Sequence, residues 1–186
     1  MRMRAALLCL VAALVLAGCG GAEQAATPKP DVDGCKGSWL RPAPSNAPEV
    51  KAATICLLNA QRARVGSPPL IESAQLDRAA ELHSADMATR KYFEHRDPDG
   101  VEPAARIVHT GYPPIFVGEN LGWGEEEEST PAEMVRLWME SPGHRRNLLR
   151  PNYRDIGIGL AYAAPEAQPV PKQAAIYTTT FGAGAR

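Results

Sequence analysis

The N-terminal nineteen residues constrain this chain more than any other segment. Arg2 and Arg4 give a positively charged start, and Ala5 to Leu16 is an apolar run of twelve residues. A helix that spans the hydrocarbon core of a bilayer needs about 20 apolar residues. The run is therefore too short to cross a membrane, but it has the length of the apolar region of a secretory signal peptide. We predict that residues 1–18 are a signal peptide and that the rest of the chain is exported.

The end of the apolar run predicts a lipid anchor. Leu16-Ala17-Gly18-Cys19 resembles the bacterial lipobox, in which small residues let a peptidase cut before a cysteine whose sulfur carries diacylglycerol. A plain secretory signal with an incidental cysteine is the alternative. Each buried CH₂ contributes about 0.8 kcal/mol, so two or more acyl chains anchor a protein stably. The membrane is thus the expected partner of Cys19, and we expect an extracytoplasmic protein, lipid-anchored at the cell membrane or outer envelope.

The remaining chain has the composition of an ordinary globular domain. The formal net charge is −1 and 45% of the residues are hydrophobic, so no basic excess indicates nucleic acid as a partner. Residues 20–30 are rich in Gly, Ala, Gln, Thr and Pro and cannot bury an apolar face. We expect the lipidated cysteine and a flexible tether over 19–34 and one domain over 35–186.

Two cysteines remain for the exported domain. Of the four in the chain, Cys9 lies in the signal peptide and Cys19 is the lipidation site, which leaves Cys35 and Cys56. In an oxidising compartment such a pair predicts a disulfide, which would contribute on the order of 3 kcal/mol. Free thiols are the alternative, and a metal site is disfavoured because the CxxC spacing is absent.

Apolar periodicity and turn residues place helices mostly before strands, which predicts an α+β fold with an antiparallel sheet. In the first helix an inward stripe is expected at 52, 55, 56, 59 and 63. In the second, His83 falls on the apolar stripe, where we expect a hydrogen-bonded core residue; a ligand-binding histidine is the alternative. Thr130 to Glu133 forms a capping-box pattern, and Glu125 to Glu128 is expected to be a solvated loop. The expected helices are 48–64, 73–90, 103–109, 131–140 and 142–149, and the expected strands are 115–123, 155–162 and 174–181.

Three polar segments lie at the ends of predicted elements, where their side chains can converge on one cleft: Tyr92-Phe93-Glu94-His95, Gly118-Glu119-Asn120 and Ser141-Pro142-Gly143-His144-Arg145-Arg146-Asn147. Two histidines and one carboxylate suit zinc, with water as a further ligand. No HExxH motif fixes their geometry, so spacing alone leaves a metal site and a metal-free cleft both open.

The order of these motifs along the chain is more specific than any one of them. It begins with Cys56-Leu57-Leu58-Asn59-Ala60-Gln61-Arg62 and continues through His83-Ser84-Ala85-Asp86-Met87-Ala88, Tyr92-Phe93-Glu94-His95, Gly118-Glu119-Asn120-Leu121, Trp138 to Leu149 and Ile156-Gly157-Ile158-Gly159. The series resembles the CAP superfamily, also called the SCP domain, of which this chain looks like a bacterial lipoprotein member. The resemblance covers roughly residues 50 to 182, nearly the whole domain.

The resemblance implies a three-layer α-β-α sandwich with a central antiparallel sheet and one large cleft. The family typically places two His and two Glu in the cleft, and His95, Glu119 and His144 match three of those positions, with Asn120 beside them. The fourth position is Ser141 here. Glu140 precedes it by one residue, about 100° around a helix, so a complete four-residue set is not predicted.

Three functions remain open on this reading. The favoured one is a binding module for a lipid, a divalent metal or a protein partner, with zinc as the one candidate cofactor. The second is a protease-like hydrolase in which His95 and His144 polarise a water and Glu119 is the general base. Ser84 and Ser141 are conceivable nucleophiles, but no GxSxG is present and Ser141 fits a helix N-cap better. The third is a purely structural cluster. The incomplete set makes an enzyme the less favoured function.

Overall fold

The computed structural model describes residues 29–166 and 172–184. The predicted signal peptide, Cys19 and most of the predicted tether lie outside these residues. The sheet has the strand order β1-β3-β4-β2, with β1 (Ile71–Glu72), β2 (Pro114–Glu125), β3 (Asp155–Ala161) and β4 (Ala174–Gly184). The three long strands are antiparallel. The sequence did not reveal the short β1, which pairs parallel with β3 and makes the sheet mixed.

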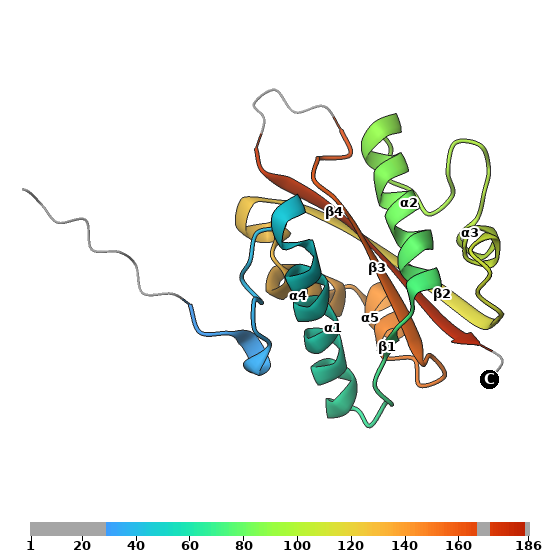
Figure 1. Ribbon diagram of the computed structural model, residues 1–186. Coiled ribbons are helices and arrows are strands. Elements are labelled where there is room, and N and C mark those ends of the chain that lie inside the picture. The colour runs from blue at the N-terminus through green and yellow to red at the C-terminus, as the bar shows by residue number, and fades with distance from the viewer. Residues whose placement is uncertain (1–28, 167–171, 185–186) are drawn as a thin grey trace, which may run out of the picture.

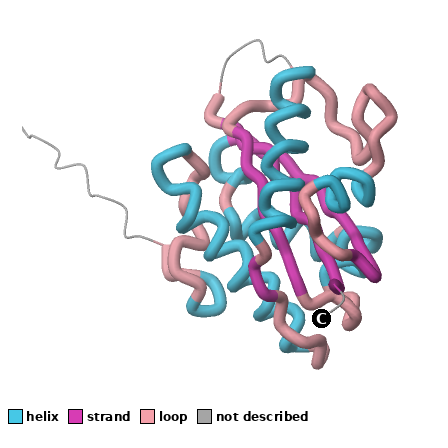
Figure 2. The backbone as a smooth tube through the Cα atoms, turned by 45° about the vertical axis from the view of Figure 1, so that its right-hand side comes forward, coloured by secondary structure: helices cyan, strands magenta, loops and turns pink. Residues whose placement is uncertain are grey.

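Helices cover both faces of the sheet, which confirms the predicted α+β sandwich (Figure 1). The helices α2 (Ala74–Arg90) and α3 (Pro103–His109) lie on one face. The helices α1 (Ala47–Arg64), α4 (Pro131–Glu140) and α5 (Pro142–Leu148) lie on the other. Figure 2, turned by 45°, shows the strands running between these two helical layers.

Alternation along β4 explains why both faces are buried. Tyr177 and Phe181 belong to the core that α1 and α4 cover, whereas Thr178 and Thr180 face α2. Successive side chains of a strand point to opposite faces, so a central strand covered on both sides is buried throughout. The helix α2 approaches the sheet very closely because β3 carries Gly159 beneath it, where a Cβ would lie 2.1 Å from the backbone of α2.

The face that α1 buries differs from the predicted stripe. The prediction for α2 is confirmed, since Leu76, His83 and Met87 are all buried. In α1, however, Cys56 is exposed, and the buried residues are Val50, Ala53, Thr54, Leu57, Leu58 and Arg62. The predicted stripe was wrong because Cys56 faces the N-terminal segment that it binds covalently. Arg62 is accepted in the core because its guanidinium donates to the carbonyl oxygens of 68, 148, 150 and 153.

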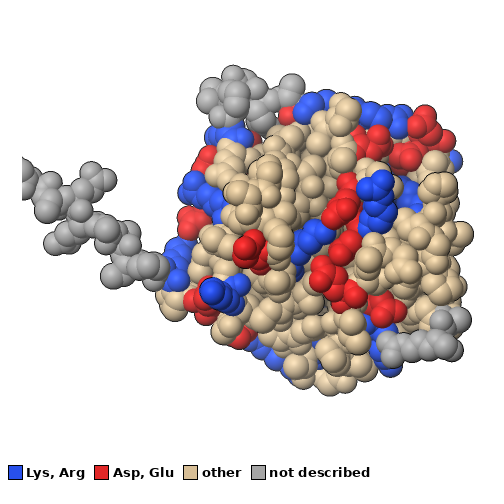
Figure 3. Space-filling model, viewed as in Figure 1, with Lys and Arg blue, Asp and Glu red and all other residues tan. Residues whose placement is uncertain are grey.

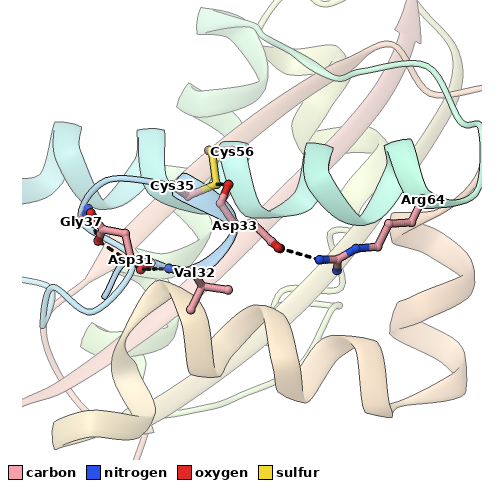
Figure 4. Close-up of a disulfide and its surroundings, with 8 residues drawn as sticks. Asp31, Val32, Asp33, Cys35, Gly37, Cys56 and Arg64 are labelled. Atoms are coloured by element: carbon pink, nitrogen blue, oxygen red, sulfur yellow. Dashed lines mark hydrogen bonds and ion pairs between the residues drawn. A yellow bond between two sulfur atoms is a disulfide. The ribbon is translucent and has the colours of Figure 1, made fainter. Parts of the chain in front are cut away.

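The predicted disulfide between Cys35 and Cys56 is confirmed, with a Cα–Cα distance of 5.7 Å (Figure 4). It fixes the N-terminal segment, which contains the 3₁₀ helices η1 (Val32–Gly34) and η2 (Pro44–Asn46), against α1. Asp33 pairs with Arg64 at 2.6 Å, and the Trp39 indole donates to the Pro30 carbonyl. Residues 30–34, which we assigned to the tether, thus contact the domain.

Two local predictions around α4 need correction. The Glu125–Glu128 run forms part of a 3₁₀ helix, η3 (Glu126–Ser129), and its carboxylates pair with Lys29, Arg41 and Lys172. Thr130 precedes α4 as predicted, but its hydroxyl donates to the Glu127 carbonyl and makes no capping hydrogen bond. The acidic run is therefore the end of β2 and the start of η3 and not a loop, and η3 supplies the partner of the Thr130 hydroxyl. Within the described part of the chain, no helix is long and apolar enough to cross a membrane.

Candidate functional site

The candidate site lies on β2, the strand at one edge of the sheet. Glu119 and Asn120 are consecutive in β2, so their side chains point to opposite faces. Glu119 points toward α2 and α3, where it meets the loop that carries His95. Asn120 points toward α5 and donates to the backbone carbonyl of His144 at 3.2 Å. The edge strand therefore joins the two halves of the predicted cleft.

Glu119 is a buried carboxylate with two cationic or donor partners. Its side chain is 2% exposed, and Arg106 on α3 donates to Oε2 at 3.0 Å and to Oε1 at 3.2 Å. His95 Nδ1 donates to Oε1 at 2.8 Å. Arg106 also donates to the carbonyl oxygens of His95 and Val101. One guanidinium thus holds both the carboxylate and the loop that carries His95.

His83 lies behind this pair as a core residue, as predicted. Its side chain is 1% exposed, and Nε2 is 3.9 Å from Glu119 Oε1. Nε2 donates to the Glu94 carbonyl at 3.0 Å. Burial lowers the pKa of His83, and the Glu119 charge opposes that shift without cancelling it. A neutral His83 therefore supports the loop at its Glu94 carbonyl instead of facing a ligand.

His95 presents the other side of its ring to solvent. Its side chain is 51% exposed although Nδ1 is held by Glu119. A carboxylate that accepts from one ring nitrogen fixes the orientation and tautomer of an imidazole and leaves the second nitrogen to act. Nε2 of His95 has no hydrogen-bond partner among residues 29–166 and 172–184. It is the open donor or acceptor of the site.

His144 lies in the first turn of α5 and is half-buried. Burial lowers the pKa of His144, and the positive charge of His95 lowers it further. The structure joins His95 to Glu119 by a hydrogen bond and Asn120 to the backbone carbonyl of His144, with Glu119 as the buried member and His95 as the exposed one.

Residues of α5 and the loop after it satisfy the free edge of β2. Asn147 donates to the Glu119 carbonyl at 3.0 Å and to Asn120 Oδ1 at 3.1 Å. The Tyr153 hydroxyl donates to the Val117 carbonyl at 2.9 Å. An edge strand otherwise exposes unpaired carbonyl groups that can form hydrogen bonds with a strand of another chain. Gly118 is required here, because a Cβ would lie 2.3 Å from the Tyr153 hydroxyl.

The residues present do not fit a zinc site built from the two histidines and Glu119. Arg106 already donates to both carboxylate oxygens, and a guanidinium at that position repels a second cation. Glu140 does not replace the missing fourth residue, since its side chain is 62% exposed and pairs with Arg136. No group of three or more His, Cys, Asp or Glu in the described ranges is arranged to hold a metal ion.

Neither candidate nucleophile is placed for covalent chemistry. Ser84 is fully buried, with its hydroxyl 2.8 Å from the Thr178 hydroxyl and 3.1 Å from the Gly159 carbonyl. It joins α2 to the sheet. Ser141 occupies the N-cap position of α5 as expected, although its side chain makes no capping hydrogen bond. A nucleophile needs a base within hydrogen-bond reach, and among the residues that the structure describes neither serine has one.

The match to a known family covers most of the domain. The family described as "CAP: Cysteine-rich secretory protein family" matches residues 56–176. This chain belongs to the CAP family. The matched range contains all four predicted cleft residues, and the CAP domain is therefore the unit in which the site is built.

Individual relatives agree with this assignment. The chain is 36% identical over 117 residues to the uncharacterised protein YkwD of Bacillus subtilis. The aligned region covers 63% of this chain and 44% of YkwD. An extracellular SCP-domain protein of Bacillus anthracis superposes with a TM-score of 0.59 at 25% identity, over 76% of this chain and 44% of that one. This CAP chain thus spans less than half the length of either relative. An outer surface protein of Borrelia burgdorferi shares the fold, with a TM-score of 0.59 at 19% identity over 69% of this chain and 88% of its own.

Two residues that organise the site escaped the sequence analysis. Arg106 was not singled out, and Asn147 appeared only as the end of a polar segment. The local signal for Arg106 is that it directly precedes the buried Ile107 on a seven-residue helix without acidic residues. Because its own helix has no acidic residue, the ion-pair partner of Arg106 lies on another element, and the sequence did not identify Glu119 as that partner.

Proposed function

We propose that this CAP domain is a binding module, held outside the cytoplasm by a lipid on Cys19, whose cleft captures a lipid headgroup or a protein partner through His95 and His144. The observation that carries the proposal is the burial and hydrogen bonding of the Glu119 carboxylate. This group is buried and bonded to Arg106 and His95. The protein itself satisfies this carboxylate, so in this proposal the imidazoles of His95 and His144 are the groups that contact the ligand.

The same observation disfavours the hydrolase alternative. A general base must accept a proton from the attacking water at hydrogen-bond distance. Glu119 already accepts three hydrogen bonds from Arg106 and His95, and its side chain is only 2% exposed, so an attacking water does not reach it in this arrangement. With no serine positioned as a nucleophile, ligand capture uses the residues as they stand, whereas hydrolysis requires them to rearrange.

Photocrosslinking from Gly143 tests the binding role. Gly143 precedes His144 and has nothing within 4 Å of a built Cβ, so a benzophenone amino acid fits there. We expect the membrane-anchored chain to yield a discrete adduct that disappears in the double variant His95→Ala/His144→Ala. His109→Ala is the matched control, because His109 is an exposed histidine of α3 outside the site. An adduct that is equally strong in the double variant would refute capture by the cleft.

A zinc titration distinguishes the alternative. Calorimetry of the full chain should show only weak binding that Glu119→Gln leaves unchanged, because Arg106 already holds that carboxylate. Stoichiometric binding that is lost in Glu119→Gln, His95→Ala and His144→Ala, but kept in His109→Ala, would instead support a metal-assisted hydrolase.

The anchor is tested separately. In Cys19→Ala we expect the protein to leave the membrane fraction or to remain unprocessed, since the acyl chains are lost with the sulfur. Cell fractionation and immunoblotting measure where the variant is found. Normal membrane retention of Cys19→Ala would contradict the lipoprotein assignment.

A further inference from the structure

The arginines of α5 and the loop after it lack acidic partners. Within residues 29–166 and 172–184, Arg145, Arg146 and Arg150 form no ion pair. On the face that carries α1 and α2, by contrast, acidic and basic side chains lie side by side (Figure 3). Most other exposed or half-buried arginines pair with a carboxylate: Arg41, Arg64, Arg90, Arg96, Arg106 and Arg136. Three arginines without an ion pair among the described residues therefore lie within six residues of one another, at α5 and just after it, in a chain whose net charge is −1.

Two of these arginines line a surface hollow of about 490 Å³. Arg146 and Arg150 are four residues apart, and Asn147 between them adds a polar wall. The other lining residues are Gly143, Leu149 and Pro151, so no carboxylate lines the hollow. Two guanidinium groups without a counter-charge form a site for an anion, and their planar donor groups suit phosphate oxygens in particular.

Arg150 also joins the hollow to an exposed apolar surface. Its guanidinium lies 5.8 Å from the ring centroid of Phe116 and 5.6 Å from that of Tyr153. Phe116 is 43% exposed, and Ile115 beside it is 61% exposed. Stacking on aromatic rings orients a guanidinium without neutralising its charge. Basic and large apolar side chains thus lie next to one another at the start of β2.

We propose that this surface, defined by Ile115, Phe116, Arg146 and Arg150, contacts an anionic lipid surface. Phosphate groups of the lipids bind Arg146 and Arg150, while Ile115 and Phe116 enter the boundary between headgroups and acyl chains. The apolar pair identifies the source of the phosphate, because a free phosphate ion has no contact for it. This membrane contact goes beyond the proposed function, uses none of the cleft histidines, and sets which side of the domain faces the bilayer.

Vesicle binding tests the contact without the anchor. A chain that begins at Lys29 keeps every described helix and strand and the disulfide, so it isolates the surface from Cys19. We expect it to bind phosphatidylcholine vesicles that contain about a third phosphatidylglycerol and to bind pure phosphatidylcholine far more weakly. Arg146→Gln/Arg150→Gln should weaken binding about 30-fold, which corresponds to about 1 kcal/mol per basic residue at an anionic surface.

The matched control is Lys36→Gln/Arg78→Gln. It removes the same charge from exposed positions outside the hollow and should reduce binding only slightly. Phe116→Ser should weaken binding in the presence of both arginines, and His95→Ala/His144→Ala should bind as the wild type does, which keeps this test independent of the cleft. Thermal melts monitored by circular dichroism establish that each variant is folded.

Three results would overturn the proposal. The first is equal loss of binding in the control and in Arg146→Gln/Arg150→Gln. The second is equal binding to anionic and neutral vesicles. The third is saturable binding of inorganic phosphate by the wild type without vesicle binding, which would make the hollow a site for a free anion.

Discussion

Arginines lie on both faces of the edge strand β2, in opposite settings. On the face toward α3, Arg106 is 12% exposed and bonded to the buried carboxylate of Glu119. On the face toward α5, Arg150 is exposed and its guanidinium lies near the rings of Phe116 and Tyr153. It forms no ion pair with a carboxylate of the described residues. The same residue type is a structural support in one place and an open binding group in the other. The difference is whether the fold itself supplies the counter-charge.

The buried Arg106–Glu119 pair stabilises the site, whereas the exposed Arg146 and Arg150 are free to bind a ligand. Burying a charged pair is costly, and the pair persists only when its hydrogen bonds are nearly all satisfied. Arg106 and Glu119 meet this condition through His95 and the carbonyl oxygens of residues 95 and 101. Arg146 and Arg150 remain hydrated, so they cost little in the free protein and are available to an anion.

Breaking the buried pair should have the largest effect. Arg106→Ala leaves Glu119 buried without its cation, and we expect a loss of about 3–5 kcal/mol in the free energy of unfolding. Urea denaturation measures it. Adding Glu119→Gln should recover a large part of the loss, because no charge is then left unpaired.

The matched control for Arg106 is Arg136→Ala, which removes an exposed arginine that pairs with Glu133 and Glu140. Its effect should stay within about 1 kcal/mol, as for surface ion pairs in general. Equal losses in both variants would contradict the structural role assigned to Arg106.

Removing the disulfide should have the next largest effect. Cys35→Ser opens the 21-residue separation between Cys35 and Cys56 and should lower the free energy of unfolding by about 3 kcal/mol. The difference from wild type should vanish when both proteins are melted under reductant. If the two proteins melt at the same temperature under oxidising conditions, the cross-link does not stabilise the fold.

Acidification should lower the stability of the protein through the buried histidines His83 and His144. Burial lowers the pKa of His83 and of His144, so below pH 6.5 the unfolded state binds protons that the native state does not. Stability is then complete above the unfolded value and falls as the pH drops through it. Melting temperatures from about pH 8 to about pH 5 measure the fall.

His83→Gln identifies the contribution of the most buried imidazole and should flatten that fall. A comparison between variants is needed because burial raises the pKa of Asp77 to about 6. In the native state Asp77 keeps its proton to a higher pH than in the unfolded state, so its contribution to stability grows as the pH drops. An unchanged slope in His83→Gln would show that His83 does not titrate differently on folding.

The exposed arginines should have the smallest effect on stability. Arg146→Gln/Arg150→Gln should change the free energy of unfolding by less than about 0.5 kcal/mol, as surface substitutions away from special features do. Urea denaturation beside Arg106→Ala gives the comparison directly. A loss comparable to that of Arg106→Ala would show that α5 depends on these side chains and would remove the contrast between the two faces of β2.

Predictions from the sequence succeeded where the signal is local. The helix α3 begins at Pro103 and ends at His109 as expected, because Pro at the first position and Gly111 after the end punctuate it. The placement of His83 in the core also held, because α2 has a clear apolar stripe. For α1 the stripe was wrong, since small and apolar residues occur all around that helix and only the packing shows which side meets the sheet.

The amino-acid sequence by itself predicted the order of the five helices and the three long strands, the family and the disulfide pair, because periodicity, turn residues and motif order are local or cumulative signals. Only the tertiary structure decided that Arg106 holds Glu119 and that Arg146 and Arg150 stand at an acid-free hollow. The physical reason is that a charge is neutralised by whatever the fold brings within a few ångströms of it. That distance depends on how segments far apart in the sequence pack together, and a local sequence pattern does not predict this packing.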